Sequence, residues 1–156
     1  MTKEEILDQL GAAKTAHIKW VEKAKLLING LDIKENAIPV KSTDCQFGKW
    51  FYGDGQVLGT LSNNPMECMH EIENLHFNLH DIYLNIFNIY FSEDKKQGFF
   101  AKLLGLKRKQ PSPSEIELAK NYYEKMENVS TKLLDEISRL ERRLIAVSDE
   151  KIESLS

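Results

Sequence analysis

Two histidines four residues apart, His76 and His80, lie in the stretch ENLHFNLHDIY, whose apolar spacing is that of a helix. Side chains at positions i and i+4 of a helix point the same way, so the two imidazoles share one face. Leu75, Leu79 and Ile82 form an aliphatic stripe beside that face. The spacing therefore predicts that both imidazoles lie at or near the interior, where their polar nitrogens need partners.

A third histidine, His17, occupies a core position of an earlier helix, with Ala13 and Trp20 as its neighbours in the same stripe. A buried polar group left unpaired costs about 1–3 kcal/mol, so three unpaired imidazoles would remove a large part of a stability of roughly 5–15 kcal/mol. One interpretation gives each imidazole its own hydrogen bond, with Glu73, one turn from His76, as a candidate partner. The other gives all three one shared partner, a metal ion.

Zinc suits the second interpretation, because helical imidazoles at i and i+4 can both reach one Zn²⁺ at about 2.0–2.1 Å. His17 on the facing helix would be the third ligand. Cys45, in the irregular segment between the two helices, is the natural fourth, since its thiolate binds zinc at about 2.3 Å. His70 lies on another face of its helix, and Cys68 is two turns away from His76, so both fit less well. On spacing alone, the metal site and the separate hydrogen bonds both remain open.

The composition bounds the kind of protein. With 156 residues, 42% of them hydrophobic, the chain can bury one core, and we expect a single domain over residues 1–156. Two cysteines form no disulfide framework, which is typical of the reducing cytoplasm, where we expect the protein to act. The acidic start is unlike a secretory signal, and no apolar run reaches the roughly 18 residues of a membrane span. The net charge of −3 argues against nucleic acid as a partner.

Three long segments have helical patterning, and each begins at a recognisable cap signal. These signals are Thr2 with Glu5, Asn64 before Pro65, and Ser114 with Glu117. The first apolar stripe runs to Leu31, and the second helix runs to about Phe91. The segment between these two helices is rich in glycine and contains Pro39, so we expect a loop with one or two short helical turns.

The third helix has the most regular stripe, whose steps alternate between three and four residues, a period of about 3.5 that is typical of bundle or coiled-coil packing. We call these positions the closing seam: Ile116, Ala119, Tyr123, Met126, Ser130, Leu133, Ile137, Leu140, Leu144 and Val147. The sequence therefore predicts an all-α, four-helix-bundle-like domain with a short irregular helical segment carrying the cysteine. We expect core motifs over about 5–92, a connector over about 92–113 and a closing helix over about 114–148, with part of its seam packed against another subunit.

Three blocks of the sequence together resemble one bacterial family: AHIKW at 16–20, DCQFGKWFYG at 44–53 and LHFNLHDIY at 75–83. The chemoreceptor zinc-binding (CZB) domain has the same order of blocks: a histidine followed by tryptophan, a cysteine segment with Gly-Lys/Arg-Trp, and His-x-x-x-His. The resemblance implies that His17, Cys45, His76 and His80 bind Zn²⁺. It also implies a cytoplasmic regulatory role, homodimers, and a chemoreceptor or diguanylate cyclase as signalling partner. No signalling coil or cyclase domain is recognisable in the sequence, so we expect a standalone domain.

A shell of three histidines and one cysteine is full, whereas catalytic zinc normally keeps a position for water, so we expect no enzyme activity. A zinc-bound thiolate can instead sense, because oxidants attack thiolates and form a sulfenic acid reversibly. We therefore expect a zinc-binding sensor in chemotaxis or cyclic-di-GMP signalling, whose Cys45 responds to zinc level, hypochlorite or peroxide. One alternative is a purely structural zinc in a helical adaptor or dimerisation module. The other is a hemerythrin-like di-iron protein, for which the ligands are too few and a cysteine is out of place.

Overall fold

The computed structural model describes residues 1–63, 65–91 and 110–155. Within these ranges the chain forms helices and no strands, so the predicted all-α fold is confirmed. The elements in chain order are α1 (Lys3–Ile28), η1 (Glu35–Ala37), α2 (Gln46–Tyr52), η2 (Asp54–Thr60), α3 (Met66–Phe91), α5 (Pro113–Ile145) and α6 (Asp149–Glu153). The α2 helix and the 3₁₀ helix η2 form the predicted short helical segment, which follows directly after Cys45.

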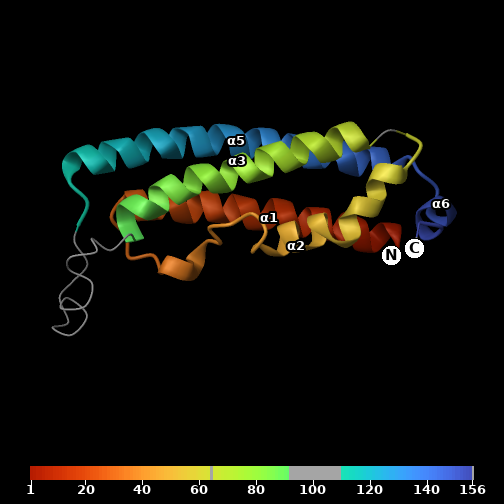
Figure 1. Cartoon of the computed structure of the whole chain (residues 1–156), viewed down its shortest axis with the longest axis horizontal. Helices are drawn as coiled ribbons and strands as arrows, with labels where there is room; N and C mark the ends of the chain where they lie inside the picture. Colours follow the sequence, from red (N-terminus) through yellow and green to blue (C-terminus); the bar gives the residue numbers. More distant parts are fainter. Residues whose placement is uncertain (64, 92–109, 156) are drawn as a thin grey trace.

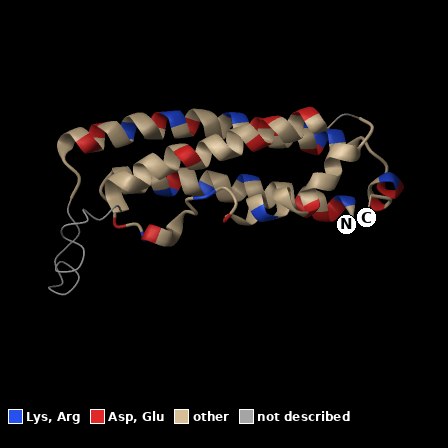
Figure 2. Cartoon of the chain, in the orientation of Figure 1, with Lys and Arg blue, Asp and Glu red and all other residues tan. Residues whose placement is uncertain are grey.

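The three long helices α1, α3 and α5 run along the long axis of the molecule, and α5 packs against both of the others (Figure 1). α5 runs in the opposite direction to α1 and α3. Ion pairs tie it to both: Lys14 on α1 lies 2.5 Å from Glu141, and Glu67 on α3 lies 3.1 Å from Arg139. Acidic and basic residues are interspersed along the outer side of α5 (Figure 2). The shorter α2 packs against α1, and η2 contacts α3, so the irregular segment joins the two helices that carry the histidines.

The predicted apolar stripes form the core. In α1 the buried stripe positions are at most 4% exposed: Ile6, Leu10, Ala13, His17, Ala24 and Leu27. The closing seam is also buried from Ala119 to Val147, where each position is at most 8% exposed within the single chain. Its first position, Ile116, is half-buried, and Val147 lies just after the end of α5. Packing inside one protomer therefore already covers most of this seam. The expectation that part of it packs against another subunit stays a prediction, for which Ile116 is the seam position left half-buried.

The boundaries of α1 differ from the prediction at one end. Thr2 and Glu5 form the predicted capping box, in which the Glu5 N–H donates to Thr2 Oγ1 (3.2 Å) and the Thr2 N–H donates to the Glu5 carboxylate (2.7 Å). Leu31, however, is 50% exposed and is not part of the core. The reason is that α1 ends at Ile28 and Gly30 has a φ of 88°, a left-handed conformation that turns the chain away from the helix axis.

α5 begins earlier than predicted, because its cap is Ser112 and not Ser114. Ser112 Oγ accepts a hydrogen bond from the Glu115 N–H (3.2 Å), and the Glu115 carboxylate accepts one from the Ser112 N–H (2.6 Å). Pro113 then fills the first helical position, where its fixed φ and missing N–H are best tolerated. The helix ends at Ile145 instead of about residue 148, and the short α6 follows. The cap predicted at Asn64 and most of the predicted connector, residues 92–109, lie outside the described residues.

Replacing Ser112 with alanine is expected to lower the free energy of unfolding by about 1 kcal/mol, because it removes the acceptor for an N–H in the first turn of α5. Ser114→Ala is the matched control: Ser114 is exposed two residues later, and its Oγ lies 3.1 Å from Ser112 Oγ without being the acceptor for the Glu115 N–H. It should change the free energy of unfolding by less than about 0.5 kcal/mol. Urea unfolding followed by circular dichroism gives both values. A larger loss in the Ser114 variant than in the Ser112 variant would place the cap where the sequence predicted it.

Candidate metal centre

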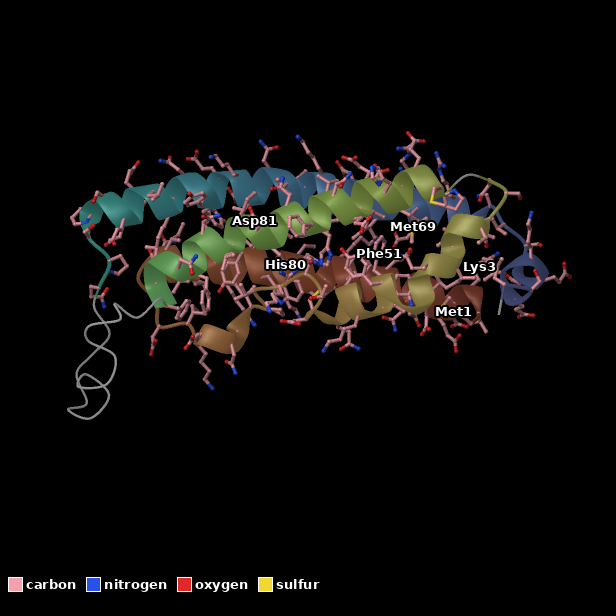
Figure 3. All side chains as sticks on the ribbon, in the orientation of Figure 1. Met1, Lys3, Phe51, Met69, His80 and Asp81 are labelled. Carbon is pink, nitrogen blue, oxygen red and sulfur yellow. The ribbon has the colours of Figure 1, made fainter. Side chains whose placement is uncertain are left out.

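The four side chains singled out in the sequence converge in the interior of the bundle. α1 carries His17, α3 carries His76 and His80, and Cys45 caps the N-terminus of α2. Their ligand atoms all lie within 4.8 Å of one another. Each of the four residues is at most 4% exposed. His80, labelled in Figure 3, lies on the side of α3 that faces α1.

Backbone carbonyls orient two of the imidazoles. His17 Nδ1 lies 2.6 Å from the carbonyl oxygen of Ala13, one turn back on α1. His80 Nδ1 lies 2.9 Å from the carbonyl oxygen of Pro39 and 3.3 Å from that of Val40. Both Nδ1 atoms therefore carry the hydrogen and donate it, which leaves a lone pair on each Nε2. In the described part of the chain these two Nε2 atoms are buried without a hydrogen-bond partner, as expected of metal ligands held by their other nitrogen.

The third imidazole lies against the cysteine, with Cys45 Sγ 3.2 Å from His76 Nε2. Ligand atoms of a tetrahedral zinc site lie roughly 3.3–3.6 Å apart, given bond lengths of about 2.0–2.3 Å, so this pair is close to the required spacing. Sγ also accepts a hydrogen bond from the Gly48 N–H (3.1 Å) and lies 3.2 Å from the Ser42 carbonyl oxygen. His76 Nδ1 has no partner among the described residues, Glu73 included, so separate hydrogen bonds do not satisfy this ring.

The donor set fits zinc. Imidazole and thiolate are ligands that zinc prefers, and four protein ligands complete its tetrahedron. A bound ion would also satisfy the buried Nε2 atoms of His17 and His80, which otherwise lack a partner in the described structure. The group contains no carboxylate, whereas the di-iron sites of carboxylate bundles depend on several. This composition argues against the hemerythrin-like alternative.

Burial keeps the three imidazoles in their neutral form at pH 7. It lowers the pKa of His17 to about 4 and the pKa of His76 to about 2, with smaller contributions from neighbouring imidazoles. Burial also lowers the pKa of His80. For Cys45, burial raises the pKa and outweighs the N–H groups of Gly48 and Phe47, which lower it. The imidazoles are therefore ready to bind a metal, whereas the thiol must lose its proton as the metal binds.

The metal-free protein is expected to lose stability as the pH falls below about 6.5. Histidines of the unfolded chain take up protons near their ordinary pKa of about 6.5. In the folded protein, the pKa of His17 is about 4 and that of His76 about 2. Between about pH 6.5 and these values the unfolded state therefore binds more protons than the folded state, so the free energy of unfolding decreases as the pH is lowered. Urea unfolding of chelator-treated protein between about pH 7.5 and 5 measures the effect. The control variant His70→Ala, which removes an exposed histidine, should show the same loss of stability as the wild type. A stability that does not change over this range would contradict the buried, neutral imidazoles.

Sequence reasoning missed the groups that hold the ligands in place. At Gly48 a Cβ would lie 1.8 Å from the Ser42 carbonyl oxygen, so a larger residue does not fit without moving the backbone. A glycine inside a predicted helical turn was the available signal. The sequence could not indicate which backbone carbonyls orient two of the imidazoles, because every residue has a carbonyl. His70 and Cys68, the candidates judged to fit less well, lie outside the group of four.

Comparison with known proteins agrees with this geometry. Residues 17–86 match the family described as the chemoreceptor zinc-binding domain (CZB), and this range contains all four residues of the group. The resemblance seen in the sequence motifs and the predicted zinc cofactor are thus confirmed. No curated protein and no solved structure matches the chain. Within the described ranges, none of the helices combines the length and the apolar content that a membrane span requires.

Proposed function

Because residues 17–86 match the chemoreceptor zinc-binding domain family, we propose that this chain is a zinc-binding regulatory sensor and not an enzyme. The observation that carries the proposal is the closed group of His17, Cys45, His76 and His80. Four protein ligands support regulation over hydrolysis, since hydrolytic zinc sites keep one position for water. We propose that the domain acts in the cytoplasm, in chemotaxis or cyclic-di-GMP signalling.

Cys45 is the ligand proposed to respond to the signal. It caps α2, a helix of 7 residues, whereas the histidines lie on α1 and α3, each of 26 residues. A short helix is easier to displace than a long one packed along its length. When bound, zinc would hold the Cys45 thiol in its thiolate form. His17 and His80 keep their orientation when Cys45 moves, because their Nδ1 atoms are bonded to carbonyls, and this makes the response reversible.

For a peroxide signal, the Cys45 sulfur donates an electron pair to one peroxide oxygen. The O–O bond breaks, a sulfur–oxygen bond forms, and hydroxide leaves and takes up a proton, so that the thiolate becomes a sulfenic acid. The oxidised sulfur is a poorer ligand and separates from the histidines. Cellular thiols reduce it again. If zinc level is the signal instead, loss of the ion releases Cys45 without oxidation.

Homodimerisation and a chemoreceptor or cyclase partner belong to the same proposal. Since the closing seam is covered within one chain from Ala119 onward, the larger candidate contact surfaces are exposed apolar side chains elsewhere. Phe77 on α3 is 62% exposed and Ile18 on α1 is 45% exposed. Displacement of α2 would be the local change that such a partner detects.

Mild oxidation of the zinc-loaded protein separates a sensor from a purely structural zinc. Stoichiometric peroxide or hypochlorite is added, zinc release is followed with a chromophoric indicator, and helix content is followed by circular dichroism. We expect zinc to leave while most of the helix signal remains, and reductant to restore binding. Cys68→Ser is the matched control and should release zinc as the wild type does. Zinc loss with wholesale unfolding would favour the structural alternative, and zinc that stays bound would contradict oxidant sensing.

A further inference from the structure

His76 differs from the other two imidazoles in having no backbone anchor. Carbonyl oxygens lie 2.6 Å from His17 Nδ1 and 2.9 Å from His80 Nδ1. His76 Nδ1 is buried without a hydrogen-bond partner in the described structure, although His76 is 0% exposed. Something other than a hydrogen bond at Nδ1 must therefore fix the orientation of this ring.

The first turn of α2 supplies that contact. The Phe47 ring packs edge-on against the His76 ring, with centroids 5.1 Å apart and planes at 80°. At Gly48 a Cβ would lie 3.3 Å from His76 Cε1, so the α2 backbone approaches the same ring closely. Together with the Cys45 sulfur at Nε2, these groups enclose His76 from the side of α2.

Phe47 is itself held firmly in α2. It is 4% exposed, and its ring lies 5.4 Å from that of Phe51 and 6.0 Å from that of Trp50. It also contacts the His17 ring at 5.8 Å, but His17 has a carbonyl anchor of its own. Edge-to-face aromatic contacts have a preferred geometry, so a shift of Phe47 changes the preferred orientation of the ring packed on it.

We propose that Phe47 is a positioning residue of the zinc site, through which α2 controls two of the four ligands. Cys45 is controlled directly, because it caps α2, and His76 is controlled through the Phe47 ring. This inference rests on the proposed function, since it describes what displacement of α2 does to the site. Displacement then removes one ligand and frees a second, while His17 and His80 stay oriented. Displacement of α2 therefore lowers the zinc affinity more than the loss of Cys45 alone would.

The test measures zinc affinity, by competition with a chromophoric chelator, and the ¹⁵N signals of the imidazole rings in the zinc-loaded protein. In Phe47→Ala we expect the zinc Kd to rise by about 10–100-fold, the range typical of losing a group that orients a ligand. We expect the His76 ring signals to shift or broaden while those of His17 and His80 persist. Phe47→Leu, which keeps most of the buried volume, should raise the Kd by roughly 3–10-fold.

Phe51→Ala is the matched control, because Phe51 is the same residue type on the same helix, is 1% exposed, and has no ring contact with an imidazole among the described residues. Because the Phe51 ring also packs on Phe47 at 5.4 Å, the zinc Kd of Phe51→Ala should rise as well, but clearly less than that of Phe47→Ala. Unchanged Kd and His76 signals in the Phe47 variants would overturn the inference, as would an equal loss of affinity in Phe51→Ala. If Phe47→Ala fails to fold by circular dichroism, Phe47→Leu decides by the same measurements. A wild-type protein that binds no zinc would instead defeat the proposed function.

Discussion

Removing zinc is expected to lower the free energy of unfolding by about 4 kcal/mol, measured against protein in free zinc at ~1,000 times its Kd. The ion binds the folded chain, in which four ligand atoms lie within 4.8 Å of one another, and an unfolded chain does not hold them together. Without it, the Nε2 atoms of His17 and His80 are buried without partners, and each costs about 1–3 kcal/mol. The loss is thus a large fraction of the stability of a typical domain.

Urea unfolding in zinc-buffered solution and after chelation and dialysis measures this difference. His17→Ala is the informative control, because it removes one ligand and should make the two unfolding curves nearly coincide. His17→Ala should itself be no more stable than the chelated wild type. Identical midpoints for the wild type with and without zinc would show that the group of four does not couple metal binding to folding.

Replacing His80 with alanine is expected to raise the zinc Kd by at least ~100-fold, because losing a group that merely orients a ligand already costs about 10–100-fold. His80 is also the residue through which α3 holds the chain at Pro39 and Val40, at 2.9 and 3.3 Å. The variant therefore loses both a ligand and the link between α3 and the segment leading to Cys45. Competition with a chromophoric chelator gives the Kd.

His70→Ala is the control for His80→Ala. His70 is exposed on the same helix, and its Nε2 lies 3.3 Å from Asn74 Nδ2, outside the group of four. Its zinc Kd should equal that of the wild type within error. A His70 variant that loses zinc as strongly as the His80 variant would mean that α3 binds the ion through a different face.

The helices and the site could be predicted from the sequence for different reasons. Stripes such as Leu133–Ile137–Leu140 repeat over many turns, so errors at single positions do not change the helix that they predict. The site depended on four residues, but the i, i+4 spacing of His76 and His80 places both on one face whatever the details of packing. The spacing alone left both a shared metal site and separate hydrogen bonds open, and the family resemblance then favoured zinc binding by the same four residues.

Two kinds of feature could not be predicted from the sequence: the choice between neighbouring residues that could each cap a helix, and contacts that depend on backbone geometry. Ser112 and Ser114 both precede a glutamate at the capping-box spacing, and only the place of Pro113 at the first helical position distinguishes them. The sulfur of Cys45 caps α2 as well as facing the imidazoles, which no spacing rule indicates. The carbonyl anchors of two histidines, and the lack of one at His76, belong to backbone geometry that no residue type reveals.

The most direct test of the account is metal analysis of the protein purified without added zinc, on the wild type and on Cys45→Ser. We predict about one zinc per wild-type chain, since one group of four ligands is present in the described structure, and clearly less in Cys45→Ser. Cys68→Ser, at the other cysteine, should keep the wild-type content. Wild-type protein devoid of zinc, or equal zinc in the wild type and Cys45→Ser, would contradict a zinc site completed by Cys45.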